Sequence, residues 1–480
     1  MGVGALNENT KEGDSERERW LALVSRALAG ETFEDALVSR TADGIRIEPI
    51  SERATNARPF LRANPEQPWI VCQRVDDPDV ERARTQIAED LTQGATGLCL
   101  VFEGAPNAFG YGLPNSAETL ERVLDGVSLN NTHLRIDVHP SSRAMADWLV
   151  ALLSNRRADP AKISLSFGID PGAIFAGTGR LRMSIEALQA SMPQSLAHFF
   201  ALGVPGILLE ADGRVLHNAG ATEAQELGFM LASAVAHLRL FQEARQALVY
   251  AAPHIGFSLS VDQDQFLSMA KIRALRRLWI RIQETCSIPP SAAVIHAETS
   301  YRMMSAEDPE TNILRSTVAC FAAATGGADT ISVLPHTIPH GLPASFAHRI
   351  ARNTQIIMLR ESHLDHVADP VFGSGSIEAL TEDMCEAAWA EFQRIEAEGG
   401  VLVSLRDGHV QKRVLEARAR LADEYVSGRR PIVGATLHPL RENPTVETLA
   451  ATRRPAPTDG IVHCEPLLPI RVDELARASA

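Results

Sequence analysis

Three histidines, His296, His336 and His340, carry the side chain that most often ligates metals, and each lies near the end of a strand-like run. A metal site requires such ligands to converge on one point. Pro339 excludes a regular helix that would bring His336 and His340 onto one face. We therefore favour polar loop histidines and predict no metal site.

Two further pairs of residues could transfer protons or contact a substrate. Asp137 and His139 end the run LRIDVHP and share one face of a strand, as an acid–base pair would. No nucleophile signature accompanies them, so structural hydrogen bonding is the favoured interpretation. Glu298 and Tyr301 follow another strand-like run and are candidates for a substrate contact.

Composition disfavours several classes of function. The 480 residues are 45% hydrophobic and 22% charged, which is typical of a globular protein with one large domain plus extensions, or with two domains. The net charge of -14 and the absence of basic runs disfavour nucleic acids and membranes as partners. Neither a phosphate-binding loop nor a dinucleotide-type glycine pattern occurs.

Cysteine usage and the N-terminal residues indicate the cytoplasm. The six cysteines lie singly, without a C-x-x-C pair, which indicates reduced thiols rather than a zinc site or disulfides. They are Cys72, Cys99, Cys286, Cys320, Cys385 and Cys464. The N-terminal residues are charged, and no stretch of the chain reaches the ~18 apolar residues that a membrane span requires. We therefore expect a cytoplasmic protein.

The elements that must position these side chains alternate between strands and helices. The predicted strands are 69–75, 96–102, 134–140, 163–169, 206–211, 257–261, 292–297 and 329–335. The predicted helices include 144–156, 221–240, 264–285, 311–324 and 377–399. Eight such units predict an α/β fold, a (β/α)8 TIM barrel. We divide the chain into a helical N-terminal extension (1–45), the barrel (46–410) and a C-terminal helix with an extended tail (411–480).

Small hydroxyl side chains recur two residues apart in three of the predicted strands. The pairs are Ser164 and Ser166, Ser258 and Ser260, and Thr330 and Ser332. Residues two apart share one face of a strand. If that face points inward, the lumen of the barrel is small and polar; if it points outward, the hydroxyls bond to nearby backbone. Alternation does not distinguish these two arrangements.

Long stretches of the sequence resemble the barrel domain of methylmalonyl-CoA mutase. The segments HNAGATEAQELGFMLASAVAHLR (217–239) and 308–381, which includes ARNTQ (351–355), carry the resemblance. QFLSMAKIRALRRLW (265–279) and QPWIVCQRVDDPD (67–79) extend it. The resemblance implies a barrel, radical chemistry with adenosylcobalamin, and a CoA arm that runs along a lumen lined by small polar residues.

The sequence departs from this family where the family's catalytic side chains are expected. Arg214 and Val215 replace a Tyr-His pair whose histidine contacts the thioester carbonyl, and Arg74 replaces the tyrosine that drives cobalt–carbon cleavage. Gly168 and Val294 stand at the positions of a glutamine of the fourth strand and an arginine of the seventh. Loss of one such group commonly costs ~10²–10³ in rate. We therefore predict no catalytic residue in this chain.

The cobalamin-binding domain of the family is expected to be absent. Its lower-ligand motif has the form D-x-H-x-x-G, and the segment RDGHVQKR supplies Asp407 and His409 but places Lys412 at the glycine position. The 68 residues that follow Lys412 are too few for the βαβ units of a cobalamin fold. We interpret Asp407 and His409 as a surface turn ahead of a helix.

The resemblance and the departures together predict a non-catalytic small (beta) subunit of a heterodimeric mutase. The catalytic large subunit would bind adenosylcobalamin and acyl-CoA, and the N-terminal extension would wrap that partner. Two alternatives remain open. One is a divergent acyl-CoA mutase rebuilt around Arg74, Arg214 and His217, served by a separate cobalamin-domain protein; the other is a regulatory or chaperone-type binder of acyl-CoA.

Overall fold

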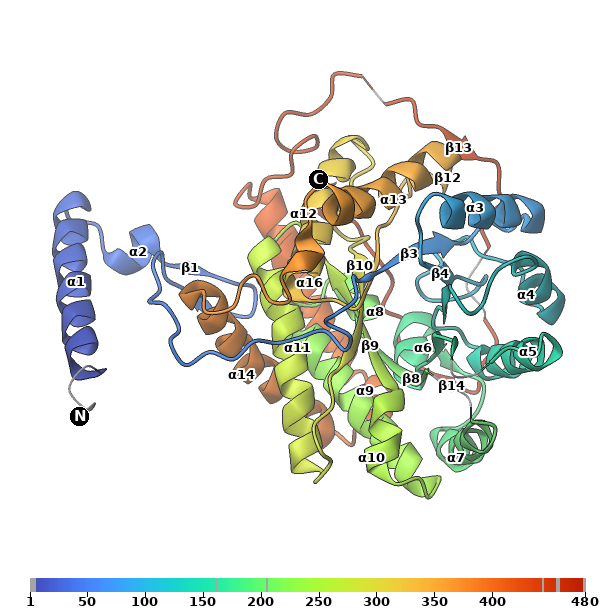
Figure 1. Ribbon diagram of the computed structural model, residues 1–480. Coiled ribbons are helices and arrows are strands. Elements are labelled where there is room, and N and C mark those ends of the chain that lie inside the picture. The colour runs from blue at the N-terminus through green and yellow to red at the C-terminus, as the bar shows by residue number, and fades with distance from the viewer. Residues whose placement is uncertain (1–5, 160–161, 204–205, 443, 455–457, 478–480) are drawn as a thin grey trace.

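Eight parallel strands close into a barrel, which confirms the predicted fold class (Figure 1). The computed structural model describes residues 6–159, 162–203, 206–442, 444–454 and 458–477. The strands follow the order β10-β11-β3-β4-β5-β6-β8-β9 around the barrel. Their bounds are β3 (Ile70–Val75), β4 (Gly97–Leu100), β5 (His133–Ile136), β6 (Leu165–Ile169), β8 (Ile207–Asp212), β9 (Ile255–Val261), β10 (Val294–Thr299) and β11 (Thr330–Ser332).

Helices cover the outside of the barrel, because parallel neighbours must be joined by crossovers. They are α3 (Val80–Thr92), α4 (Ala117–Val123), α5 (Ser142–Asn155), α6 (Pro171–Thr178), α7 (Ile185–Ala201), α8 (Arg214–Ala219), α9 (Glu223–Glu243), α10 (Leu248–Ala251), η2 (Ala252–His254), α11 (Gln265–Thr285), α12 (Thr311–Gly326), α13 (Ser345–Arg360), η3 (Leu364–His366) and α14 (Gly375–Ala397). The five helices predicted above correspond to α5, α9, α11, α12 and α14.

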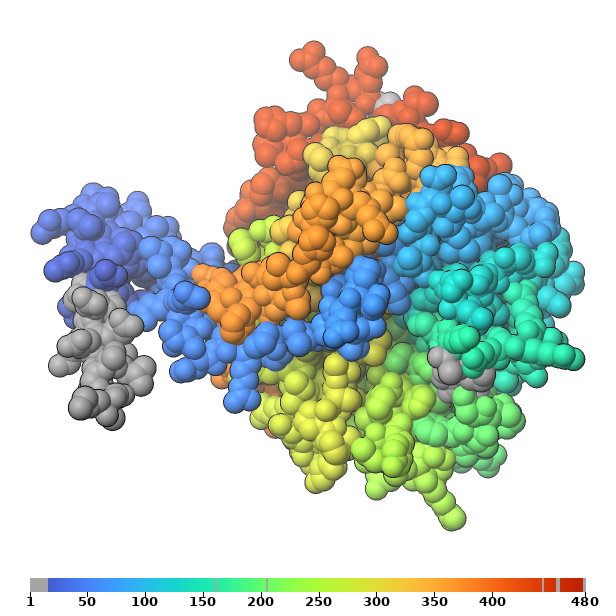
Figure 2. Space-filling model, viewed as in Figure 1, coloured from blue at the N-terminus to red at the C-terminus, as the bar shows by residue number. Residues whose placement is uncertain are grey.

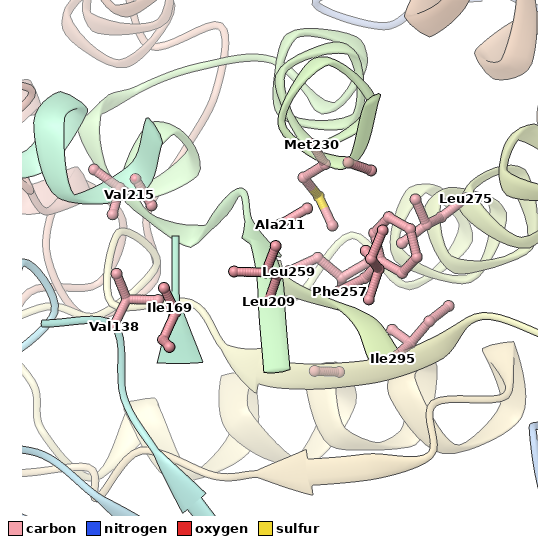
Figure 3. Packing of buried hydrophobic residues seen from close by; sticks show 14 of the residues in the cluster. Val138, Ile169, Leu209, Ala211, Val215, Met230, Phe257, Leu259, Leu275 and Ile295 are labelled. Atoms are coloured by element: carbon pink, nitrogen blue, oxygen red, sulfur yellow. The ribbon is translucent and has the colours of Figure 1, made fainter. Parts of the chain in front are cut away.

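The core lies between the strands and this outer layer of helices. Alternate strand residues point outward, and in β8, β9 and β10 these positions are apolar. Leu209, Phe257 and Ile295 are buried there and share one cluster with Met230 of α9 and Leu275 of α11 (Figure 3). The other face of each strand must therefore line the lumen.

The two helices of the N-terminal arm stand away from the barrel (Figures 1 and 2), whereas its hairpin lies against the barrel, with Ile45 in the main core and Asp43 accepting from the backbone N–H of Ala224. The arm comprises α1 (Leu6–Ala27), α2 (Phe33–Leu37) and a hairpin of β1 (Ser39–Arg40) with β2 (Arg46–Ile47). Residues 16–27 of α1 bury no side chain, and Leu23 is 63% exposed. An ion pair of 2.7 Å between Arg17 and Glu48 ties α1 to the chain that follows the hairpin.

The chain after α14 returns over the barrel. It forms α15 (Val401–Arg406), α16 (His409–Val426), β13 (Thr448–Leu449), β14 (Val462–His463) and α17 (Val472–Arg477). Strand β13 pairs with β12 (Leu342–Pro343), and β14 pairs with β7 (Arg180–Leu181), both in antiparallel fashion. Within the described ranges, every helix is too short or too polar to cross a bilayer.

Candidate functional site

The inward positions of the barrel strands carry charged side chains. Arg135 of β5 and Asp137, the residue after that strand, lie two apart, as do Glu210 and Asp212 in β8. With their neighbours they form one buried group, which we call the lumen network. Its members are Arg74, Asp76, Arg135, Asp137, Glu210, Asp212, Arg214 and Glu298.

Arg214 is the centre of the lumen network. It follows β8 immediately as the first residue of α8, so its guanidinium reaches back over the strand ends. Its Nε and Nη2 donate to the two carboxylate oxygens of Asp212 at 3.0 and 2.6 Å. Nη2 also bonds to Asp137 after β5, and Nη1 lies 3.2 Å from Glu298 of β10. One fully buried side chain thus joins three strands.

Two further arginines complete the network. Arg135 bonds to Glu210, which also accepts from Ser258 and, at 3.5 Å, from Ser166. Arg74 of β3 donates to Asp76 at 2.6 Å and to the carbonyl of Asn107 at 2.7 Å.

Five carboxyl groups face three guanidinium groups in this network, which leaves two surplus negative charges if all are ionised. Burial raises the pKa of Asp212 and of Glu298, in spite of the adjacent Arg214. Burial also acts to raise the pKa of Asp137, but Arg214 and Arg135 outweigh it and the pKa falls. Protonation of Asp212 or Glu298 therefore relieves the surplus charge.

A neighbouring carboxyl group, Asp170, provides a test by pH. Burial raises its pKa to about 8, while its oxygens accept from the backbone of Gly172 and Asp212, both at 2.9 Å. In the unfolded chain Asp170 releases its proton at about pH 4. Between about pH 4 and about pH 8 the folded state therefore binds more protons than the unfolded state. The free energy of unfolding therefore falls as pH rises from about 4 to about 8.

The substitution Asp170→Asn is expected to flatten this slope. The asparagine still caps α6, and it loses the acceptor for the Asp212 N–H equally at every pH. Urea unfolding at pH 5, 7 and 8.5 measures the slope for both proteins. Equal slopes for the variant and the wild type would contradict the assignment.

The structure changes the picture of the lumen serines. Ser166 and Ser258 bond to Glu210, and Ser260 and Ser332 are buried on the same inward face. Ser164 is exposed before β6 begins and pairs with His133 at 2.7 Å. The strand face that carries most of these serines thus points inward, and long charged side chains occupy the lumen beside them.

In each of the two candidate pairs, the acid–base pair and the substrate-contact pair, the two residues contact different partners. Strand β5 ends at Ile136, and Asp137 bonds to Arg214, whereas His139 contacts the carbonyl of Glu103 at 2.8 Å. Glu298 belongs to the lumen network. Tyr301 instead stacks on another aromatic ring above the strand ends.

The histidines considered as metal ligands also contact different partners. His296 pairs with Thr330 at 2.7 Å, and His336 packs edge-on against Phe346. In the described part of the chain, His, Cys, Asp and Glu side chains form no group of three or more that could hold a metal ion.

Comparison with known proteins places this barrel in a family. The sequence profile described as "Methylmalonyl-CoA mutase" matches residues 48–456. The chain belongs to the methylmalonyl-CoA mutase family. A protein of Streptomyces virginiae named "Methylmalonyl-CoA mutase small subunit" is 35% identical over 92% of this chain and 73% of its own length. The same name is given to a protein of Propionibacterium freudenreichii subsp. shermanii, which is 32% identical over 88% of this chain and 66% of its own length. A probable methylmalonyl-CoA mutase small subunit of Mycobacterium tuberculosis is 40% identical over 67% of this chain. That match covers 52% of the relative's own length.

The positions matched to catalytic residues of the methylmalonyl-CoA mutase family do not form one pocket. Arg74 and Arg214 meet through Glu298, at 3.8 and 3.2 Å. Val294 begins β10 at the opposite end of the barrel, paired with Gly256. Gly168 has a φ of +57°, and a Cβ there would lie 2.1 Å from the carbonyl oxygen of Ile136. The backbone therefore leaves no room for the glutamine expected from the family.

The segment that contains Val215 and His217 is helix α8, which begins two residues after β8. Val215 packs in the core, as Figure 3 illustrates. His217 Nε2 lies 2.8 Å from Ser300 Oγ, and Nδ1 lies 3.3 Å from Glu226. Burial, with Arg302 and Lys271 nearby, lowers the pKa of His217 well below its usual range. This chain of contacts is fully buried and separate from the lumen network.

The residues of this chain do not fit the adenosylcobalamin of the methylmalonyl-CoA mutase family. Asp407 and His409 are exposed, and Asp407 is held by Arg406 at 2.8 Å. Among the described residues, the sheets other than the barrel are three two-stranded ones, none of which is the open sheet of a cofactor domain. Barrels hold their ligands at the C-terminal ends of the strands, and here the ring of Phe109 lies over Arg74 of the lumen network and stacks on Tyr301.

Proposed function

We propose that this chain is the non-catalytic small (beta) subunit of an adenosylcobalamin-dependent methylmalonyl-CoA mutase, which interconverts methylmalonyl-CoA and succinyl-CoA. The partner is the catalytic large subunit, which binds both adenosylcobalamin and acyl-CoA. The role of this chain is to stabilise that partner in a heterodimer.

The lumen network is the observation that carries this proposal. An acyl-CoA arm that passed along the barrel axis would have to displace Arg135 from Glu210 and Arg214 from Asp137, Asp212 and Glu298. Separation of a buried ion pair leaves uncompensated charges in a medium of low dielectric constant. Ser166 and Ser258 accordingly serve the network through Glu210 rather than a substrate.

The N-terminal arm supports the proposal of a partner. Most helical stability in proteins comes from tertiary packing of an apolar face. In residues 16–27 of α1 no side chain is fully buried, and Trp20 packs on Phe33 of α2, within the arm itself. Its apolar side chains Leu21 and Leu23 are 38% and 63% exposed. The large subunit is the surface on which the arm would bury them.

Binding measurements with the large subunit test the arm. Deletion of residues 2–30 is expected to raise the dissociation constant at least tenfold, and Leu23→Asp should raise it severalfold. The matched control is Leu202→Asp, since Leu202 is 49% exposed at the end of α7 and remote in sequence from the arm. The control should bind within twofold of the wild type. Equal binding by the arm variants would refute the role of the arm.

A mutase assay separates this proposal from a divergent enzyme built around Arg74, Arg214 and His217. The chain is mixed with adenosylcobalamin, a cobalamin-domain protein and methylmalonyl-CoA, without any other barrel chain. We expect no succinyl-CoA. Turnover in this mixture would show that the chain is itself catalytic.

A further inference from the structure

The C-terminal segment runs across the face of the barrel that carries the C-terminal ends of the strands. We call residues 458–477 the cap segment. Its backbone donates to the segments that follow β6, β8 and β10, at distances of 2.7 to 2.9 Å. The donors and acceptors are Ile461 to Leu181, Cys464 to Gly179, Leu467 to Ala176, Ile470 to Asn218 and Val472 to Arg302. Hydrogen bonds spaced along twelve residues fix the path of this segment.

Side chains anchor the cap segment as firmly as its backbone does. Leu467 is 2% exposed and belongs to the main core. Ile470, Val472 and Leu475 are buried in a second cluster with Leu421 and Tyr425 of α16. Leu468, next to Leu467, is 55% exposed and borders a surface pocket that Phe109, Tyr301 and Arg471 also line. The segment thus has an inner face bound to the barrel and an outer, more exposed face.

A stack of four side chains links the cap segment to the lumen network. Arg74 lies over the ring of Phe109 at 5.1 Å, Phe109 stacks on Tyr301 at 4.1 Å, and Arg471 of the cap segment lies 6.0 Å from the Tyr301 ring. Arg471 also donates to the Tyr301 hydroxyl at 3.2 Å. Phe109 adopts a φ of +51°, a strained value for a bulky residue.

We infer that the cap segment is a built-in cover over the mouth of this barrel, and that the large subunit therefore docks elsewhere and leaves it in place. The identity of the partner rests on the proposed function. Closure of the mouth is a property of this chain alone. A barrel covered in this way presents no surface on which a cofactor domain can reach the strand ends.

Thiol reactivity tests closure in the full chain. Cys464 of the cap segment is half-buried, its Sγ lies 3.4 Å from the carbonyl of Phe175, and burial raises its pKa to about 12. Cys286 is exposed and serves as the internal standard. With a small aromatic disulfide at pH 8, Cys464 should react at least tenfold more slowly than Cys286. Equal rates would overturn the inference.

Two neighbouring substitutions distinguish opening from general damage. Leu467→Asp removes an inner anchor and should speed the reaction of Cys464 at least tenfold, while Leu468→Asp, on the outer face, should leave it within twofold. If Leu467→Asp fails to fold, Arg471→Ala replaces it, because it removes only the contacts to Tyr301 and the adjacent carboxylates. No change with any inner variant contradicts the cover.

Hydrogen exchange in the complex tests the second half of the inference. The amides of Cys464, Leu467 and Ile470 should exchange as slowly in the heterodimer as in the chain alone, and Leu468→Asp should bind the large subunit within twofold of the wild type. Loss of protection on binding, or tenfold weaker binding by Leu468→Asp, would overturn it. If no complex forms, the proposed function fails, whereas the thiol test of closure still stands.

Discussion

Replacement of Arg214 by methionine is expected to destabilise the chain by about 3–5 kcal/mol at neutral pH, which is a large part of the stability of a typical domain. The side chain is fully buried, and its removal leaves Asp137, Asp212 and Glu298 without their common cation. Methionine fills most of the volume, so the loss measures charge rather than a cavity. Urea denaturation followed by far-UV circular dichroism gives the change in free energy.

An exposed arginine provides the matched control. Arg429 pairs with Asp423 at 2.7 Å, and these side chains are 64% and 73% exposed. Because surface ion pairs contribute about 0–1 kcal/mol, Arg429→Met should change stability only slightly. The double variant Arg214→Met with Asp212→Asn should recover part of the loss, since it removes one of the unpaired charges. Similar losses for Arg214→Met and Arg429→Met would mean that the lumen network is not a buried ionic cluster.

Introduction of the family glutamine at Gly168 is expected to destabilise the chain by several kcal/mol. The positive φ alone costs about 1 kcal/mol for a residue with a Cβ. The larger effect comes from the carbonyl oxygen of Ile136, which lies 2.1 Å from the ideal Cβ position, so β5 and β6 would have to move apart. Thermal unfolding of Gly168→Gln checks this expectation.

Gly126 separates the two effects. Its φ is +80°, and nothing lies within 4 Å of an added Cβ. Gly126→Gln should therefore show the cost of backbone conformation without the steric clash. Equal stability of the two variants would mean that the close approach of β5 to Gly168 does not destabilise the glutamine variant. The family side chain could then be restored by a single substitution.

The sequence alone predicts the barrel because the information for it is local. Each of the eight strands is a short apolar or β-branched run, and each of the long helices α9, α11 and α14 has a periodic apolar face. The ends of strands were predicted less well. Strand β11 covers only Thr330–Ser332, because Val333 to Pro335 already belong to the loop that follows it.

The lumen network could not be predicted in the same way, because its partners are far apart in the sequence. Arg135 and Glu210 are separated by 75 residues, and Arg214 and Asp137 by 77. A signal was nevertheless present: charged residues two apart at the end of β5 and in β8 share the faces of the strands that carry the serines elsewhere. The path of the cap segment leaves no such signal, since no residue type encodes its backbone hydrogen bonds and its apolar anchors pack on residues remote in the sequence.

The bonds inside the barrel brace its opposite walls. Arg135 ties β5 to β8, which have only β6 between them. Arg214, at the end of β8, bonds to both Asp137 and Glu298 and so joins β5 to β10, which lie on opposite sides of the ring of eight strands. These internal ion pairs oppose the separation of the barrel strands that entry of a long ligand along the axis would require. In a heterodimer with a catalytic barrel, we expect this subunit to stay rigid, and we expect the conformational changes that accompany turnover to occur in the catalytic subunit.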